Sequence, residues 1–453
     1  MKKDHLFFEY REKYQEFIYE SYEIVDNIDT YKIIFHFEIK DLEQFNPYIE
    51  IDKNYFNKLD SLTNELIFHI GMVELISYWK AACPKKVIIK AGFLKEEQIK
   101  WFKKLYYYGL GEFFYTNGIT TSIDDFMDII CTATYQERKS ISYQGKGNLI
   151  PIGGGKDSVV SLEILKEEEN ACFIMNPKTV TLECAKLAEY TDKNTITLKR
   201  VIDKKLLSLN EKGFLNGHTP FSALLAFITY LMAYQNNKRY IVLSNEGSAN
   251  EATILGTKIN HQYSKTYEFE NDFNHYTRNY FAIEITYFSF LRPLSEFQIA
   301  MLFSHYEKYH PVFKSCNVGS KIEPWHWCCN CGKCLFVYCI LSPFLYKEKL
   351  VSIFKEDLFE KKELLPTLLE LTGNAESKPF DCVGTVEEVQ FALSLTILKL
   401  KEKNKSLPYL LDYYEKNDKL SNVSDNLLTH YNEENNLNPY FEKLLRNELK
   451  KYV

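Results

Sequence analysis

The stretch Leu149-Ile-Pro-Ile-Gly-Gly-Gly-Lys-Asp-Ser-Val-Val-Ser-Leu-Glu163 joins a short apolar run, three glycines and the start of a helical pattern. A strand that passes through a glycine turn into a helix is typical of phosphate-binding loops. Glycines let backbone N–H groups approach an anion closely, and the first turn of the helix adds partial positive charge. The spacing differs from the Walker A motif and from the dinucleotide motif Gly-x-Gly-x-x-Gly.

The order of residues in this turn resembles the pyrophosphate loop of the N-type ATP pyrophosphatases, whose pattern is Ser-Gly-Gly-x-Asp-Ser. Glycine stands here where that family usually has the first serine. The resemblance implies an ATP site in which backbone amides hold the pyrophosphate part, while the lysine adds charge and the aspartate helps to hold Mg²⁺. A glycine-rich turn with solvated charges is the alternative. The residues expected to bind the nucleotide are Gly153, Gly154, Gly155, Lys156, Asp157 and Ser158.

The composition indicates a folded protein that is large enough for two or three domains. The chain has 453 residues, is 45% hydrophobic and carries a formal net charge of −6, which argues against a nucleic-acid-binding surface. It shows no targeting segment, and its longest apolar runs are shorter than the ~20 residues of a membrane-spanning helix. Eleven cysteines in such a chain predict a cytoplasmic protein with reduced or metal-bound thiols.

The first part of the chain predicts an N-terminal α+β domain, residues 1–140. Alternating polar and apolar residues in 31–39 indicate strands of a small antiparallel sheet. The aromatic stretch 112–117 is expected to be a strand or a turn. The charged, helically patterned residues 346–453 predict a C-terminal helical region.

Between these regions, residues 141–345 alternate strand and helix patterns. This rhythm predicts an α/β domain of the PP-loop (HUP-like) kind, with a parallel sheet and helices on both faces. Ligands of such sheets bind at the carboxyl ends of the strands, where the glycine turn lies. The strands are expected at 148–152, 171–175, 195–199 and 240–244.

Two further segments belong at the same edge of the predicted sheet. Met175 ends the second strand, where proteins of this fold place adenine. The polar stretch 244–251 follows the fourth strand, so we expect Asn245 and Glu246 to contact the nucleotide. A solvated surface loop is the alternative. The stretch 292–296, with its single arginine, is a weaker candidate for closing the pocket.

Four cysteines have the spacing of a structural zinc site. The block contains Cys-x2-Cys-x2-Cys with one cysteine upstream, and a similar arrangement occurs in the 7-cyano-7-deazaguanine synthases. Buried reduced thiols and iron–sulfur ligation are the alternatives. If zinc binds, Cys329 and Cys339 are spare packing thiols. The expected ligands are Cys316, Cys328, Cys331 and Cys334.

Several separate segments together resemble one family, the ATP-dependent UDP-N-acetylmuramoyl-L-alanyl-L-glutamate epimerases of the MurL type. In that family the phosphate loop also begins with glycine. The resemblance spans residues 65–395. Its motifs, besides the glycine turn and the cysteine block, include Gly71-Met-Val-Glu-Leu-Ile-Ser-Tyr-Trp-Lys-Ala-Ala-Cys83, Asn216-Gly-His-Thr-Pro-Phe-Ser222, Asn260-His-Gln-Tyr-Ser-Lys265 and Cys382-Val-Gly-Thr-Val-Glu-Glu-Val389.

The resemblance implies that the terminal L-glutamate of a UDP-MurNAc-dipeptide is converted to D-glutamate, while ATP becomes AMP and pyrophosphate. Adenylation of the carboxylate makes the α-hydrogen acidic enough for a general base. His218 or His261 is our candidate for one proton-transfer group and Cys382 for the opposite face. Lys265 lies in the polar stretch that we expect to contact the substrate. A helix-capping neighbour for His218 and a core thiol for Cys382 are the alternatives.

Two rival functions stay open at this point. The first is an ATP pyrophosphatase that adenylates a nucleobase or tRNA, because it shares the glycine turn and the cysteine block. A tRNA-binding form would need a basic face. The second is a nucleotide-binding regulator that binds ATP tightly without releasing AMP.

Overall fold

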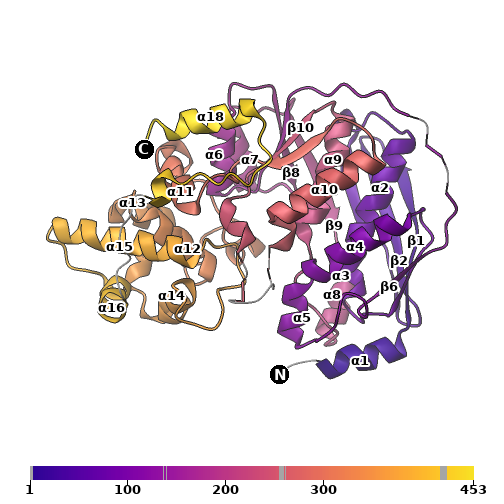
Figure 1. Cartoon of the computed structure of the whole chain (residues 1–453), viewed down its shortest axis with the longest axis horizontal. Coiled ribbons are helices and arrows are strands. Elements are labelled where there is room, and N and C mark those ends of the chain that lie inside the picture. The colour runs from indigo at the N-terminus through magenta and orange to yellow at the C-terminus, as the bar shows by residue number, and fades with distance from the viewer. Residues whose placement is uncertain are drawn as a thin grey trace. The chain divides into compact units, whose positions relative to one another are not determined.

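The computed structural model in Figure 1 describes residues 4–135, 137, 138, 140–251, 253, 254, 260, 262–418 and 426–452. The chain forms two compact units, each made of three stretches. Unit 1 contains Met1–Leu149, Ile196–Ile241 and Ile259–Tyr287, and unit 2 contains Ile150–Thr195, Val242–Lys258 and Phe288–Val453. The domain limits expected at residues 140 and 345 stay a prediction.

The strands of the described residues belong to one eleven-stranded sheet. They are β1 (Glu16–Asp26), β2 (Thr30–Ile39), β3 (Glu43–Phe45), β4 (Tyr48–Asp52), β5 (Lys86–Ile89), β6 (Asp128–Cys131), β7 (Asn148–Pro151), β8 (Asn170–Met175), β9 (Thr195–Val201), β10 (Tyr240–Leu243) and β11 (Thr286–Ser289). Within unit 1, β9, β4, β2, β1, β5 and β6 are neighbours in that order, and β3 pairs with β2.

The antiparallel pairing of β1 with β2 confirms the prediction made from the alternating residues 31–39. Phe17 lies opposite Ile39, and Ile24 lies opposite Ile33. Every second residue from Ile33 to Ile39 is buried, because alternate side chains of a strand point to opposite faces. On the other side of β1, β5 runs parallel to it, so this part of the sheet is mixed.

One predicted strand has a second neighbour that the sequence did not predict. β10 pairs parallel with β7, as the alternation of strands and helices predicted. β9 lies next to β8 in the sheet and also pairs antiparallel with β4, where Arg200 lies opposite Ile49. A strand's hydrophobic pattern reports its burial and not the direction of its neighbour, so the sequence did not reveal this antiparallel pair. The sheet is therefore mixed and not parallel throughout.

The helices of unit 1 also correct one expectation. Residues 112–117, expected as a strand or turn, form a short helix that ends at Gly118 in the left-handed conformation. Burial of Phe113 and Phe114 explains why the stretch is apolar. The helices are α1 (Asp4–Lys13), α2 (Ser61–Glu74), α3 (Ile76–Trp79), α4 (Glu96–Gly109), α5 (Gly111–Asn117), α8 (Lys204–Glu211), α9 (Phe221–Gln235) and α10 (Tyr267–Tyr280).

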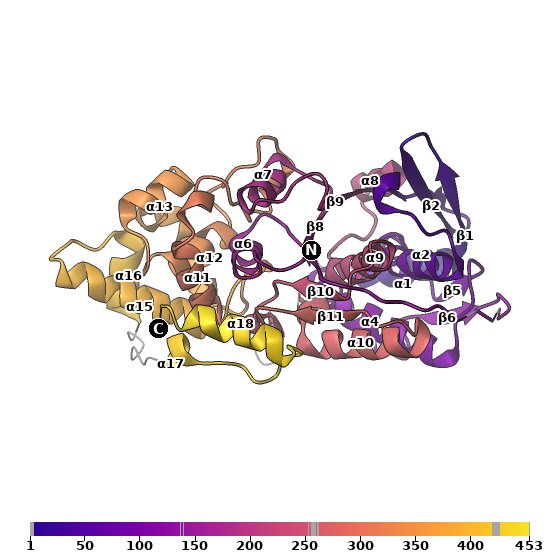
Figure 2. The same ribbon diagram turned by 90° about the horizontal axis from the view of Figure 1, so that it is seen from above.

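Unit 2 holds the remaining helices, and it includes the predicted C-terminal helical region. Here α18 lies against α6, as both views show (Figures 1 and 2). Across the described residues, no helix combines the length and the apolar character that a membrane crossing requires. The helices are α6 (Lys156–Ile164), α7 (Thr179–Leu187), α11 (Glu296–Ser304), α12 (Gly332–Leu341), α13 (Lys347–Phe354), α14 (Leu365–Leu371), α15 (Val386–Glu402), α16 (Tyr409–Asn417), α17 (Asn426–Thr429) and α18 (Pro439–Leu449).

A buried histidine links three helices of unit 1. His69 in α2 is 1% exposed, and its Nδ1 lies 2.7 Å from the carbonyl oxygen of Glu65. Its Nε2 lies 2.8 Å from the hydroxyl of Tyr276, to which the Gln98 amide also donates at 2.8 Å. Because a carbonyl only accepts, Nδ1 carries the proton and Nε2 accepts from Tyr276. Burial lowers the pKa of His69 to about 4.

We expect the buried His69 to make unit 1 sensitive to acid. In the unfolded chain this histidine is protonated near its ordinary pKa of ~6.5. In the folded chain the same imidazole stays neutral until the pH falls to about 4. The free energy of unfolding should therefore fall as the pH drops from about 6.5 towards 4, by about 3 kcal/mol from this group. Urea unfolding at several pH values measures this slope.

The comparison variants are His69→Gln and, as a matched control, His275→Gln on the exposed face of α10. His69→Gln should be less stable at pH 7 but should show a shallower decline with acid. An equal decline in His69→Gln and the native chain would contradict the assignment.

Candidate active site

The glycine turn follows β7 and opens α6, as the sequence predicted. Gly153 is exposed, and a Cβ built there would meet no described residue within 4 Å beyond its chain neighbours. Gly154 has φ +81°, in the left-handed region that favours glycine. Gly155 is the N-cap, so the helix begins at Lys156. The turn thus leaves open space beside the N-terminus of a helix.

A second segment holds the turn in place. The backbone N–H of Lys314 donates to the carbonyl oxygen of Gly154 at 2.9 Å. The Cβ of Ser315 lies 3.4 Å from the position that a Cβ on Gly155 would occupy. Residues 314 and 315 directly precede Cys316, so the glycine turn and the cysteine block are connected through two residues.

Lys156 is buried and paired with carboxylates. Its side chain is 2% exposed, and its ammonium forms ion pairs with Asp157 and with Glu296, the first residue of α11. Glu246 completes a group of three carboxylates, each offering an oxygen within 4.8 Å of the others. One ammonium and three carboxylates therefore lie at the N-terminus of α6, directly after the glycine turn.

The neighbouring charges affect the titration of Glu296 and of Lys156. Burial raises the pKa of Glu296, and the neighbouring Asp157 and Glu246 raise it further, while Lys156 opposes them. Burial would lower the pKa of Lys156, but Asp157 and Glu296 outweigh it and raise that pKa. The ammonium therefore stays charged, and the group retains an excess of acidic oxygens that suits a divalent cation.

Two further side chains lie beside this group: Arg292, from the stretch that was a weaker candidate for closing the pocket, and Glu388, which the sequence did not predict as a site residue. Arg292, which is fully buried, donates from Nη1 to the carbonyl oxygen of Glu246 at 3.1 Å. Glu388 in α15 accepts the backbone N–H of Glu296 at 2.7 Å and that of Thr385 at 2.7 Å. Ser295 precedes Glu296 and caps α11 in a capping box. This motif marks the start of a helix in the sequence, but it does not reveal that Glu296 pairs with Lys156.

The other residues expected at the nucleotide lie as follows. Ser158 donates its hydroxyl to the carbonyl oxygen of Gly155 at 2.9 Å. Met175 is the last residue of β8 and is half-buried. Asn245 follows β10 and donates to the hydroxyl of Ser289 at 3.1 Å. Unit 2 thus contains every residue that we expected to bind the nucleotide.

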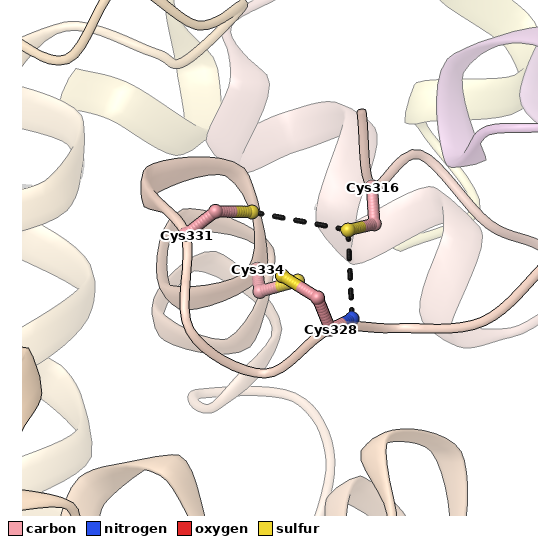
Figure 3. Close-up of side chains that lie close together, drawn as sticks. All are labelled: Cys316, Cys328, Cys331 and Cys334. Atoms are coloured by element: carbon pink, nitrogen blue, oxygen red, sulfur yellow. Dashed lines mark hydrogen bonds between the residues drawn. The ribbon is translucent and has the colours of Figure 1, made fainter. Parts of the chain in front are cut away.

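The four cysteines expected to bind metal come together, as Figure 3 shows. Their sulfur atoms all lie within 4.8 Å of one another. The sulfurs of Cys316 and Cys331 are 3.9 Å apart, and those of Cys328 and Cys334 are 3.7 Å apart. A tetrahedral zinc site with Zn–S bonds of about 2.3 Å requires sulfur separations of about 3.8 Å. The geometry therefore fits zinc.

The backbone packs closely around the four cysteines. The N–H of Gly319 donates to the Cys316 sulfur at 3.1 Å, and a Cβ on Gly319 would lie 1.9 Å from the carbonyl oxygen of His326. Only glycine fits at this position. Cys329 stays outside the group, because its thiol donates to the carbonyl oxygen of Phe354 at 3.0 Å.

Cys382 lies in a segment of unit 2 that contacts the cysteine block. The ammonium of Lys333 donates to the carbonyl oxygen of Cys382, and Asn317 donates to Asp381 at 2.8 Å. Cys382 itself is half-buried. Nearby, Lys378 forms an ion pair with Glu251, which ties this segment to the polar stretch after β10.

The remaining catalytic candidates lie in unit 1. Nδ1 of His218 lies 3.8 Å from a carboxylate oxygen of Glu112, and the preceding Gly217 accepts a hydrogen bond from Lys80 at 2.5 Å. Burial lowers the pKa of Lys80 to about 8. Lys265 donates to Gln262 at 3.2 Å. His261 lies outside the described residues.

The end of α4 contacts both of these candidate segments. The ring of Tyr108 lies 5.2 Å from that of Tyr263, which begins the 3-10 turn Tyr263–Lys265. A Cβ on Gly109 would lie 2.7 Å from Pro220, which follows the segment of His218. Pro220 is the N-cap of α9.

We expect the buried pair of Lys156 and Glu296 to couple strongly in a double-mutant cycle. Glu296→Leu leaves the buried ammonium with only Asp157, so the free energy of unfolding should fall by about 3–5 kcal/mol. Lys156→Met/Glu296→Leu removes both charges and should be more stable than Glu296→Leu alone. Urea unfolding of the four proteins measures the coupling, and additive losses would contradict it.

Comparison with known proteins places the whole architecture in one family. Residues 8–290 match the MurL N-terminal domain, and residues 312–426 match the MurL C-terminal domain. The UDP-N-acetyl-alpha-D-muramoyl-L-alanyl-L-glutamate epimerase of a Micromonospora species is 35% identical over 332 residues, which cover 72% of this chain and 73% of the relative.

Two further proteins with the same name also match this chain. The one from Xanthomonas oryzae pv. oryzae is 33% identical over 335 residues, covering 72% of this chain and 73% of its own. The one from Salinispora tropica is 34% identical over 328 residues, covering 71% of this chain and 70% of its own. By these matches, which run through both units, the chain belongs to the MurL family.

Proposed function

We propose that this protein is an ATP-dependent epimerase of peptidoglycan precursor synthesis. It converts the terminal L-glutamate of UDP-N-acetylmuramoyl-L-alanyl-L-glutamate to D-glutamate through adenylation of a carboxylate. Relatives that carry this epimerase name support the substrate. The use of ATP is supported chiefly by one observation, the open glycine turn at the N-terminus of α6.

The glycine turn suits a pyrophosphate group, as the PP-loop resemblance implies. The backbone amides of Gly154, Gly155 and Lys156 lie at the first turn of α6, where the helix dipole favours an anion. Beyond its chain neighbours, no described residue lies within 4 Å of a Cβ built at Gly153. In this assignment Lys156 acts mainly by holding the acidic group, because its ammonium is buried in ion pairs.

The acidic group suits Mg²⁺, which prefers oxygen ligands. Asp157, Glu246 and Glu296 would hold it, because their oxygens lie within 4.8 Å of one another beside the turn. When bound there, the ion neutralises charge on the phosphates of ATP. The excess of carboxylates over the single ammonium supports this assignment.

Adenylation of the substrate comes first in the proposed reaction. The glutamate carboxylate attacks the α-phosphorus of ATP, pyrophosphate leaves, and an acyl-adenylate forms. A base removes the α-proton, which the neutral acyl group has made more acidic, and a second group returns a proton to the opposite face. Water then cleaves the acyl-adenylate and releases AMP. His218, His261 and Cys382 are the candidates for proton transfer, and Lys265 is a candidate for contacting the substrate.

One assay tests this proposal. The protein is incubated with ATP, Mg²⁺ and the UDP-sugar L-alanyl-L-glutamate in deuterium oxide. We expect AMP, pyrophosphate and D-glutamate with deuterium at its α-carbon. Release of AMP only with a nucleobase or tRNA acceptor would support the rival pyrophosphatase instead. Unimpaired epimerisation by His218→Ala and by Cys382→Ala would exclude both residues as proton-transfer groups.

A variant of the glycine turn tests the nucleotide site. Gly153→Val should weaken ATP binding at least about tenfold, because its side chain fills the space needed by the phosphates. Its unfolding temperature should change little, since Gly153 is exposed and a Cβ built there would meet no described residue within 4 Å beyond its chain neighbours. Calorimetric titration with ATP measures the affinity, and unchanged binding would exclude this turn.

The cysteine group supports a second assignment within the same unit, a structural zinc ion held by Cys316, Cys328, Cys331 and Cys334. We expect the purified protein to contain about one zinc ion per chain by elemental analysis. Cys331→Ser should lose most of the metal and unfold at a lower temperature. The neighbouring Cys329→Ser, outside the group, should keep it. Iron, or equal zinc in both variants, would contradict this assignment.

A further inference from the structure

Unit 2 contains a cavity of about 490 Å³ whose role the epimerase function leaves open. None of the residues assigned above to nucleotide, metal or proton transfer lines it. Its walls come from three segments that are separate in sequence. The lining residues are His310, Pro311, Lys314, His326, Trp327, Cys329, Lys349, Ser352, Ile353, Phe354, Lys355 and Glu356.

The ionisable side chains that line this cavity are mainly basic. Three lysines and two histidines line it, against one glutamate. Lys349 has a carboxylate partner, Glu307, at 3.5 Å. Within the described part of the chain, neither Lys314 nor Lys355 has a carboxylate within ion-pair distance. A cavity with several ammonium groups and few carboxylates favours an anion.

The two lysines without carboxylates are held by neutral groups. The half-buried ammonium of Lys314 lies 3.2 Å from each of three carbonyl oxygens, those of residues 311, 312 and 313. The ammonium of Lys355 donates to the carbonyl oxygen of Ser352 at 2.8 Å. Carbonyl oxygens orient an ammonium but do not cancel its charge. Both charges therefore remain available to an anion.

Two lining residues have buried ring nitrogens that no described residue satisfies. His310 is 1% exposed, and its Nε2 lies 3.3 Å from the carbonyl oxygen of Phe303, whereas its Nδ1 has no partner. Nε1 of Trp327, a residue that is 6% exposed, also has none. A buried polar atom without a partner costs about 1–3 kcal/mol, so this wall gains from a polar ligand or bound water.

We propose that this basic cavity binds a phosphate-bearing small molecule, separately from the nucleotide held by the glycine turn. Lysine ammonium groups are typical phosphate ligands, and a volume in this range accommodates a molecule larger than a free phosphate ion. The shared chemistry is the phosphate group, whether it comes from a nucleoside diphosphate or from free pyrophosphate or phosphate.

The cavity also has a direct connection to the nucleotide loop. Lys314 contributes its side chain to the cavity and its backbone N–H to the carbonyl oxygen of Gly154. A ligand that orders Lys314 would thereby stabilise the glycine turn. We therefore expect the occupied cavity to strengthen ATP binding, and by linkage ATP to strengthen binding in the cavity.

Calorimetric titration with UDP, pyrophosphate and inorganic phosphate tests this proposal at low ionic strength. Lys349→Met/Lys355→Met changes two residues at the cavity rim, and Lys405→Met is the control, an exposed lysine of unit 2 outside the cavity. We expect Kd for at least one probe to rise about tenfold or more in the rim variant and to stay unchanged in the control. Thermal unfolding checks that both variants are folded.

The variant Gly153→Val distinguishes binding in the cavity from binding at the nucleotide loop. Binding that persists in this variant but weakens in the rim variant supports the proposal. A lysine-dependent response to UDP identifies a nucleoside diphosphate as the source, and a response to pyrophosphate or phosphate alone identifies free phosphate. No binding of any probe, or binding lost only in Gly153→Val, would overturn it. The test needs no turnover, so a failed epimerase assay would not affect its result.

Discussion

The buried ammonium of Lys156 is the constraint on which the site region of unit 2 depends. A lysine can be removed from water only if carboxylates and hydrogen bonds replace its hydration. Asp157 follows it directly in α6, but Glu296 lies 140 residues later in the chain. The ion pair therefore requires α6 and α11 to begin side by side, which in turn fixes the glycine turn that leads into α6.

Three helix starts share this charged group. Lys156 is the first residue of α6, Glu296 is the first of α11, and Glu388 lies in the first turn of α15. The carboxylate of Glu388 accepts the N–H of Glu296, so the helices are joined by hydrogen bonds as well as by charge. Their N-terminal dipoles favour negative charge, which explains how several carboxylates can be buried so close together.

The sequence predicted local features of this architecture well. The glycine turn, the four cysteines and the parallel pairing of β7 with β10 follow from motifs and periodicity that a short stretch contains. The partner of Lys156 and the antiparallel pairing of β9 with β4 are contacts between distant stretches, and no local pattern encodes them. The helix at residues 111–117 was missed because its aromatic residues suit a buried strand equally well.

The order in which the two units can be completed during synthesis follows from how the chain is divided. Unit 1 lacks β9 and α9 until residue 235 has been made, and it lacks α10 until residue 280. The glycine turn and α6 leave the ribosome earlier, but α11, whose Glu296 pairs with Lys156, is made only after α10. The half of the chain made first therefore cannot finish folding alone, and the nucleotide loop stays without its main support until all of unit 1 has been made.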